Sequence, residues 1–218
     1  MRNIYIALGS NMGDRLANLQ QSVNRIDNEI GQVLRCSSIY EVPAVGFSGA
    51  IFLNACLVAE SEKTAKVILK GLKAIENEMG RKQVSNGSYH DRPIDLDLIM
   101  VEDEFFNSEE LSIPHPRFQD RLFVLQPLCE IAPQKRVPNQ NLTVSQLFNS
   151  CEDPTIISSY HQGLHRPAIH FLTKFNRICV EGTIGCGKTS LAKRIAEDLQ
   201  AKLFLERFAE NPFLPKFY

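Results

Sequence analysis

The segment HDRPIDLDLIM, residues 90–100, places two carboxylates at alternate positions of a strand-like run. Side chains alternate between the two faces of a strand, so Asp95 and Asp97 share one face, about 6 to 7 Å apart. The opposite face carries the apolar residues Ile94, Leu96, Leu98 and Met100. Neighbouring carboxylates repel unless a cation lies between them, and Mg²⁺ commonly binds one or two carboxylates together with substrate phosphates. The run therefore predicts a magnesium site, and a solvated strand face is the alternative.

Basic residues surround the two carboxylates in the sequence. Arg92 lies just before them, and Arg81, Lys82 and His90 stand in or beside the preceding loop. Cationic side chains form strong hydrogen bonds with phosphate oxygens. Phosphoryl transfer requires mainly alignment and charge neutralisation, which metal-bound carboxylates and arginines supply. The candidate catalytic residues are Asp95, Asp97, Arg81 and Arg92.

A second phosphate-binding pattern lies near the other end of the sequence. Residues 182–189, GTIGCGKT, fit the pattern GxxxxGK[ST] between a strand-like run, 177–181, and a helical pattern, 188–201. In such a loop the backbone N–H groups surround phosphates, Lys188 would pair with the β- and γ-oxygens, and Thr189 would reach Mg²⁺. The candidate residues of this loop are Gly182, Gly185, Gly187, Lys188 and Thr189.

The elements that must hold the carboxylates follow from hydrophobic periodicity. Alternation predicts a strand over residues 3–8, and apolar residues three or four apart predict a helix over 14–30, capped by Asp14, and another around 68–79. The other predicted strands are residues 33–42, 51–59 and 94–101, and short outer helices are predicted over 118–128 and 144–148. The order βαββαβ indicates an α+β fold with helices on one face of a mainly antiparallel sheet.

Residues 159–174 lack a periodic pattern and are predicted to form a linker. Three histidines, His161, His165 and His170, could ligate a metal from a helix, but Gly163 and Pro167 argue against that helix, so a non-ligating linker is favoured. This division predicts a first domain over residues 1–158 and a second unit over 175–218, with a second short strand over 202–205.

Composition restricts the classes of partner. The 218 residues include 24 Lys and Arg against 25 Asp and Glu, so there is no basic excess of the kind that non-specific nucleic-acid binding requires. The six cysteines form no CxxC pair, which is typical of free thiols in a reducing compartment. Neither a signal peptide nor an apolar run of roughly 18 residues is present. We expect a soluble cytoplasmic protein that binds small molecules rather than nucleic acid or a membrane; the oligomeric state stays open.

Several motifs together resemble the 6-hydroxymethyl-7,8-dihydropterin pyrophosphokinases of folate biosynthesis. They are GSN from Gly9, YEVPAVG from Tyr40, FLNA from Phe52, DRPIDLDLI from Asp91 and IPHPRFQDRLFVLQPL from Ile113, and the resemblance spans residues 1 to about 150. It implies a ferredoxin-like α+β sandwich, ATP as co-substrate, and transfer of diphosphate from ATP to the hydroxymethyl group of the pterin with release of AMP.

The resemblance also implies a role for each matching position. Asp95 and Asp97 would hold two Mg²⁺ ions that bridge the ATP phosphates, and Arg81 would lie on the phosphate side. The predicted ATP-binding residues are Glu76, Arg92, Leu98, Ser112, His115 and Arg121. The predicted pterin-binding residues are Val42, Pro43, Val45, Phe52, Asn54 and Phe123, with the ring held between the two phenylalanines, since aromatic faces suit a flat heterocycle. Core packing of the two phenylalanines and a structural role of His115 in its turn are the alternatives.

The loop between Gly80 and Asp95 departs from the family pattern. It is one residue longer, Lys82 or Gln83 stands where a second arginine is common, and Tyr89 replaces a common tryptophan. In the family this loop closes over ATP, so we expect the reaction class to be retained and the rate or the closure to differ.

The segment VEGTIGCGKTS, followed by LERFAENPFLPKFY, looks like the start of a deoxynucleoside kinase over about residues 175–218, in which Glu206 would act as the base near the sugar hydroxyl. A β-α-β piece cannot bury its apolar faces alone, because parallel strands are normally covered on both sides. We therefore expect a truncated P-loop unit in a bifunctional fusion whose first domain is the active one. The alternatives are a deoxynucleoside kinase with the first domain as passenger, and a ferredoxin-like binding module without catalysis.

Overall fold

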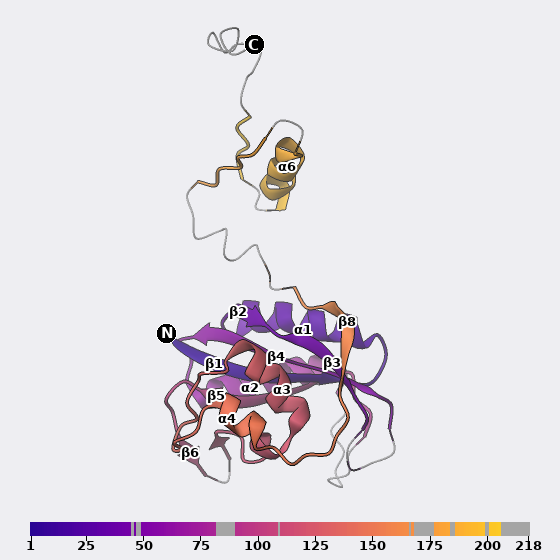
Figure 1. Ribbon diagram of the computed structural model, residues 1–218. Helices are drawn as coiled ribbons and strands as arrows, with labels where there is room; N and C mark the ends of the chain where they lie inside the picture. Colours follow the sequence, from indigo (N-terminus) through magenta and orange to yellow (C-terminus); the bar gives the residue numbers. More distant parts are fainter. Residues whose placement is uncertain are drawn as a thin grey trace, which may run out of the picture. The chain divides into compact units, whose positions relative to one another are not determined.

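The chain divides into two compact units, Met1–Pro167 and Ala168–Tyr218, shown in Figure 1. The computed structural model describes residues 1–44, 46, 49–81, 90–108, 110–165, 167, 177–183, 186–198 and 201–205. In these parts of the chain no helix is long and apolar enough to cross a membrane.

A six-stranded sheet forms the centre of the first unit (Figure 1). Its strands are β1 (Arg2–Ser10), β2 (Gln32–Cys36), β3 (Ser38–Val42), β4 (Phe52–Ser61), β5 (Asp95–Val101) and β8 (Ser158–Gly163). The order is β5-β1-β4-β3-β8, with β2 also paired to β4, and every pairing is antiparallel. A separate hairpin joins β6 (Phe106–Asn107) and β7 (Ser112–Ile113). The predicted antiparallel α+β sheet is confirmed.

The strand predicted over residues 33–42 is divided in two at Ser37. The Ser37 backbone N–H donates to the Cys56 carbonyl at 2.9 Å, and the Ser37 hydroxyl accepts from the Cys56 N–H at 2.9 Å. This side-chain bond replaces one step of the backbone ladder, so β2 and β3 both pair with β4 but are separate strands.

Helices α1 (Arg15–Glu29) and α2 (Ala65–Glu78) cover one face of the sheet as predicted. Asp14 caps α1 by accepting from the Ala17 N–H at 3.0 Å. The helix α2 is followed by Gly80, whose φ of +93° is a conformation that glycine adopts without steric cost. The predicted apolar stripes are buried in one core: Leu19, Val23, Ile26, Ile68, Leu72 and Ile75.

The opposite face of the sheet is covered by the outer helical segments, which the sequence predicted without assigning them to a face. The turn η1 (Phe118–Asp120) and the helices α3 (Leu122–Ile131) and α4 (Val144–Asn149) pack there around a second core. That core includes Tyr5, Cys56 and Val58, because β1 and β4 carry apolar residues on both faces. The single helix predicted over 118–128 is divided at Arg121.

Strand β5 contains a bulge, and because of it Met100 lies on the opposite face of the sheet from the one predicted. Leu96 and Leu98 lie in the first core as predicted, but Met100 lies in the second core together with Ile99. The register pairs Tyr5 with Met100 and the next residue, Ile6, with Leu98, so Ile99 is the extra residue of a bulge. The alternation of side chains therefore changes only after the two aspartates.

Residues 158–163, most of which were predicted to be linker, form β8 on the edge of β3. Just beyond β8, His165 donates its N–H to Gln20 Oε1 at 2.8 Å and accepts from Gln20 Nε2 at 2.7 Å. The reason is that the edge of β3 offers unpaired backbone groups, which a polar, aperiodic segment can still satisfy. No cluster of three or more His, Cys, Asp or Glu able to hold a metal occurs among the described residues; His170 lies outside them.

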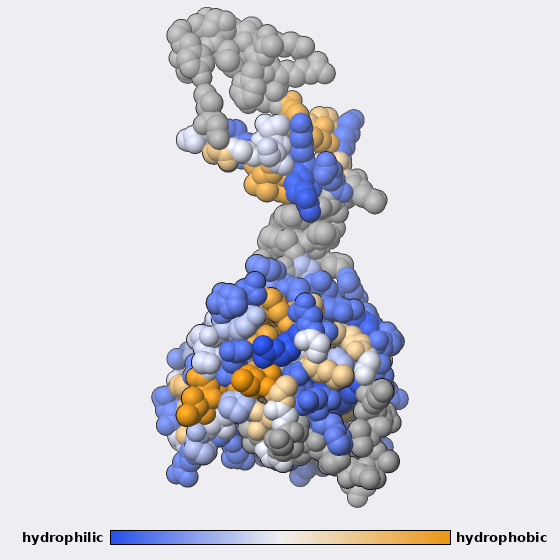
Figure 2. Space-filling model, turned by 90° about the vertical axis from the view of Figure 1, so that its right-hand side faces the viewer, coloured by the Kyte–Doolittle hydropathy of each residue, from blue (hydrophilic) through white to orange (hydrophobic). Residues whose placement is uncertain are grey.

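In the second unit, the helix predicted after the phosphate loop is present as α6 (Lys188–Asp198). The two predicted flanking strands are not: the described residues 177–183 and 201–205 contain no strand and are largely exposed. A strand needs a neighbouring strand and a covering layer, and these described segments have neither. Hydrophobic residues therefore lie at the surface beside hydrophilic ones (Figure 2); they include Ile178, Leu191 and Phe204.

Candidate active site

A cavity of about 910 Å³ lies between the sheet and the start of α3. Its walls come from β1, β4, β5, the segment around His115, the first turn of α3 and residues 150–154. This volume is in the range of small-molecule sites. The sequence-predicted residues that line it are Val42, Pro43, Phe52, Asn54, Arg81, Arg92, Asp95, Asp97, His115, Arg121 and Phe123.

Three predicted ATP-side residues are not on the wall of this cavity. Leu98 is 4% exposed in the first core, and Glu76 is 1% exposed beneath Arg81. Ser112, in β7, lines a smaller cavity of about 280 Å³ that shares His115 with the larger one. Val45 lies outside the described residues.

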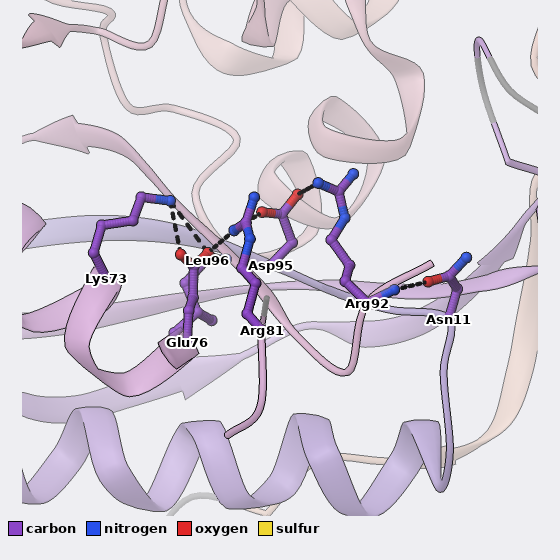
Figure 3. Close-up of polar contacts among 7 residues, drawn as sticks. All are labelled: Asn11, Lys73, Glu76, Arg81, Arg92, Asp95 and Leu96. Carbon is purple, nitrogen blue, oxygen red and sulfur yellow. Dashed lines mark hydrogen bonds and ion pairs between the residues drawn. The ribbon is translucent and has the colours of Figure 1, made fainter. Parts of the chain in front are cut away.

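Asp95 is held by two arginines at the edge of the cavity. Its Oδ1 accepts from Arg81 Nη1 at 2.5 Å, and its Oδ2 lies 3.3 Å from Arg92 Nη1 (Figure 3). Asp97 follows on the same face of β5 and also lines the cavity. Within the described parts of the chain, the Asp97 side chain makes no hydrogen bond or ion pair. One aspartate is thus fixed by basic side chains and the other offers its carboxylate to the cavity.

Glu76 supports this arrangement from below. Its Oε1 accepts from the Leu96 N–H at 2.7 Å and pairs with Arg81, and its Oε2 lies 2.9 Å from Lys73 Nζ. Figure 3 shows the result as a row of alternating charges, in which Arg81 bridges Glu76 and Asp95. Burial raises the pKa of Glu76, while Lys73, the Leu96 N–H and Arg81 act in the opposite direction. Glu76 therefore orients both Arg81 and the backbone between the two aspartates.

Asn11 is a positioning residue that the sequence-based list of site residues missed. It is 4% exposed; its Oδ1 accepts from the Arg92 N–H at 2.8 Å, and its Nδ2 donates to Asp91 Oδ1 at 2.5 Å and to the Ala50 carbonyl at 3.2 Å. These bonds join the end of β1 to the segments that lead into Phe52 and Asp95. The signal in the sequence was the GSN turn, which identified the motif without showing its partners.

The two phenylalanines of the predicted pterin site each carry an arginine above the ring. The Arg92 guanidinium lies 5.6 Å from the centre of Phe52, and that of Arg121 lies 5.6 Å from the centre of Phe123. Phe52, 8% exposed, belongs to neither core cluster. Gly9 lies beside it in the cavity, where a Cβ would come within 3.0 Å of Asn54 Oδ1. The wall therefore combines aromatic faces with positive charge.

His115 borders both cavities and is held by its backbone and its ring. Its N–H donates to the Ile99 carbonyl at 2.8 Å, and its Nδ1 accepts from the Arg117 N–H at 3.3 Å. Burial lowers the pKa of His115; Asp97 raises it, and Arg121 and Arg117 lower it further. The His115 ring is therefore neutral and accepts a hydrogen bond at Nδ1.

The donor set fits Mg²⁺. Asp95 and Asp97 present carboxylate oxygens to one cavity, and the described residues contain no third acidic, histidine or cysteine side chain that would complete a closed metal cluster. A hard cation held by two carboxylates keeps open positions for water and phosphate oxygens, which is the usual form of a magnesium site.

The phosphate loop of the second unit is internally bonded. Gly187 has a φ of +85°, which glycine adopts readily, and α6 begins at the next residue. The Lys188 ammonium group donates to the Thr183 carbonyl at 2.6 Å, within the loop itself. Gly182 and Thr189 lie in the same loop and helix start, whereas Gly185 and Glu206 lie outside the described residues.

Known families match both parts of the chain. The model of the 7,8-dihydro-6-hydroxymethylpterin-pyrophosphokinase (HPPK) family matches residues 5–133, and the deoxynucleoside kinase model matches residues 178–218. A 2-amino-4-hydroxy-6-hydroxymethyldihydropteridine pyrophosphokinase of Porphyromonas gingivalis is 41% identical over 147 residues, which are 65% of this chain and 100% of that protein. The enzyme of the same name from Bacillus subtilis is 42% identical over 138 residues, 62% of this chain and 81% of that protein.

A solved structure shares the fold at low sequence identity. The wild-type HPPK-DHPS of Plasmodium falciparum is 14% identical, with a TM-score of 0.55 over 68% of this chain. The match covers 44% of that chain, so this sequence spans less than half of the solved protein.

Proposed function

This chain belongs to the 7,8-dihydro-6-hydroxymethylpterin-pyrophosphokinase family, and on that premise we propose that its reaction takes place in the cavity beside Asp95 and Asp97. The chain catalyses the pyrophosphoryl transfer of folate biosynthesis, with ATP as co-substrate. The main support for this location is that two carboxylates, two arginines and two phenylalanines line one cavity.

The phosphates of ATP lie against the acidic and basic side chains in this proposal. Asp95 and Asp97 would hold the Mg²⁺, two ions in this proposal, and the metal would neutralise phosphate charge. Arg81 and Arg92 now pair with Asp95, so both guanidinium groups stand within reach of phosphate oxygens beside it. His115 and Arg121 extend the ATP side, and Glu76 acts through Arg81 rather than by touching ATP.

The pterin lies between Phe52 and Phe123. The flat ring stacks on aromatic faces, and Asn54, Val42 and Pro43 bound its polar edge. Asn54 is a suitable reader of a pterin because its amide both donates and accepts hydrogen bonds.

The proposed transfer is a single displacement at the β-phosphorus of ATP. The hydroxymethyl oxygen of the pterin forms a bond to the β-phosphorus of ATP, and the bond from that phosphorus to the oxygen bridging the α-phosphorus breaks. AMP leaves and the hydroxyl proton is released. The chain contributes alignment of the two substrates and positive charge on the phosphate side.

The test is AMP formation that depends on the hydroxymethyl dihydropterin. Asp95→Ala and Asp97→Ala should each abolish it, whereas Asp103→Ala should not, because the Asp103 side chain is 90% exposed and pairs only with Lys135 among the described residues. If the variant that lacks Asp95 and Asp97 together forms AMP at the wild-type rate, the assignment of the metal site is wrong.

The second unit supports a separate proposal, that the protein joins the pterin enzyme to the phosphate-loop portion of a deoxynucleoside kinase. The family match over residues 178–218 and the turn from Gly187 into α6 support it. ATP binding should be compared between the Asp97→Ala variant, which lacks the first site, and the double variant Asp97→Ala, Lys188→Ala. Equal binding by both proteins would contradict a phosphate role for Lys188.

A further inference from the structure

Two cavity residues depend on the first turn of α3. Arg121 is the N-cap residue of that helix and Phe123 lies in its first turn, and both line the cavity. The Arg121 side chain makes no capping hydrogen bond. The first N–H groups of a helix have no partner within the helix and need one from elsewhere.

Asp153 supplies that partner from far along the chain. Its Oδ2 accepts from the Leu122 N–H at 2.8 Å, across 31 residues of sequence. Its Oδ1 accepts from the Thr155 N–H at 3.0 Å and from the Thr155 hydroxyl at 2.5 Å, which fixes the carboxylate. The hydrogen bonds from Thr155 and Leu122 lower the pKa of Asp153 against the opposing effect of burial, and the nearby Arg121 lowers it further. A negative charge at a helix N-terminus is stabilising as well.

The segment that carries Asp153 is itself anchored beside the cavity. Residues 150–154 form part of the cavity wall. The chain then enters β8, which pairs with β3, the strand that ends at Val42 on the pterin side. The segment thus connects two walls of the site, although it lies beyond residue 133, where the pterin family match ends.

We propose that Asp153 is a positioning residue that holds Phe123 in place for the pterin. By fixing the Leu122 N–H, its carboxylate sets the direction in which the first turn of α3 presents the Phe123 ring. This inference rests on the proposed place of the pterin against Phe123. A helix cap with a purely structural role would lower thermal stability without changing the affinity for one substrate only.

The experiment compares KM for the pterin and KM for ATP in the full chain. Asp153→Ala should raise KM for the pterin about tenfold, which corresponds to a loss of about 1.4 kcal/mol of binding free energy, and leave KM for ATP nearly unchanged. Asp153→Asn keeps an oxygen that can accept from the Leu122 N–H and should recover most of the loss. Asp14→Ala is the matched control, because Asp14 caps α1 at 3.0 Å but does not line the cavity; its melting temperature should fall while both KM values stay unchanged.

Phe123→Ala separates this inference from the proposal on which it rests. If Phe123→Ala raises KM for the pterin and Asp153→Ala does not, Asp153 has no positioning role. The same conclusion follows if Asp153→Ala raises both KM values equally. If Phe123→Ala itself leaves KM for the pterin unchanged, the proposed position of the pterin against Phe123 is wrong.

Discussion

The strand that carries Asp95 and Asp97 and the loop that carries Lys188 both have the sequence of a phosphate site, but the structure supports them to different degrees. Strand β5 is paired along β1, and its apolar residues are buried in two cores. The Lys188 loop leads into a helix whose Leu191 is 53% exposed, and its described flanks form no strand. A motif therefore identifies a ligand class, whereas the elements around it determine whether its residues are held in position.

The charged residues of the two regions differ in the same way. Asp95 is fixed by two arginines, one of which is fixed in turn by a buried glutamate. Lys188 is bonded to a carbonyl of its own loop. Contacts between distant elements define geometry more strictly than contacts within one loop, because they restrict each partner from outside.

The largest expected effect is the loss of the cation from the first region. Chelation with EDTA should reduce AMP formation by on the order of a thousandfold, because the charge on the phosphates is no longer neutralised. Added Mg²⁺ should restore the wild-type enzyme but not Asp97→Ala. Full activity in EDTA would show that the carboxylates act without a metal.

Removing the buried Glu76 should lower the stability of the domain that carries Asp95 and Asp97. Glu76→Ala removes the acceptor of the Leu96 N–H and one of the two carboxylates that pair with Arg81, and should lower the free energy of unfolding by about 3 kcal/mol, measured by urea denaturation. Glu76→Gln retains an acceptor oxygen and should lose less. Equal stability of all three proteins would mean that Glu76 does not hold the carboxylate strand.

Removing the Asn11 hydrogen bonds should have a smaller effect, on activity rather than on stability. Asn11→Ala should decrease kcat/KM about tenfold, because Arg92 and the segment before Phe52 lose their shared anchor. Asn18→Ala is the control: Asn18 bonds to Met12 and Ser10 near the same turn and not to Arg92. If both variants lose the same activity, the turn matters and the Asn11 bonds to Arg92 do not.

A smaller effect concerns pH. Because burial lowers the pKa of His115, the unfolded state binds a proton more readily than the native state, so the contribution of His115 to stability is present above the ordinary histidine pKa of about 6.5 and is lost as the pH falls through the native value. NMR titration of the ligand-free protein should find the His115 pKa below that value. His115→Asn should remove this part of the pH dependence of unfolding; titration at or above the ordinary value would contradict the assignment.

The smallest expected effect lies in the second region. Lys188→Ala should leave pterin-dependent AMP formation unchanged, and the chain should form no deoxynucleoside monophosphate from ATP and any of the four deoxynucleosides. Nucleoside phosphorylation that Lys188→Ala abolishes would contradict this expectation, because it would show that a loop with exposed flanks is a working site.

Local patterns predicted the elements that build the first site. Periodicity identified both long helices and the cap at Asp14, and alternation placed Asp95 and Asp97 on one face of a strand. The pattern was less informative where tertiary pairing decides. Residues 158–163 have no strand periodicity and become β8 because β3 has a free edge, whereas residues 177–181 have the apolar run of a buried strand and form no strand.

Motifs and periodicity were sufficient to predict the family, the fold class and the type of ligand, because they depend on residues close together in the chain. The contacts that hold the site in place are visible in the folded protein alone. The bond from Asn11 to Asp91 spans 80 residues and that from Leu122 to Asp153 spans 31. Such partners are selected by the packing of the sheet and α3, since a hydrogen bond between distant residues forms only where the fold has already brought both groups within reach.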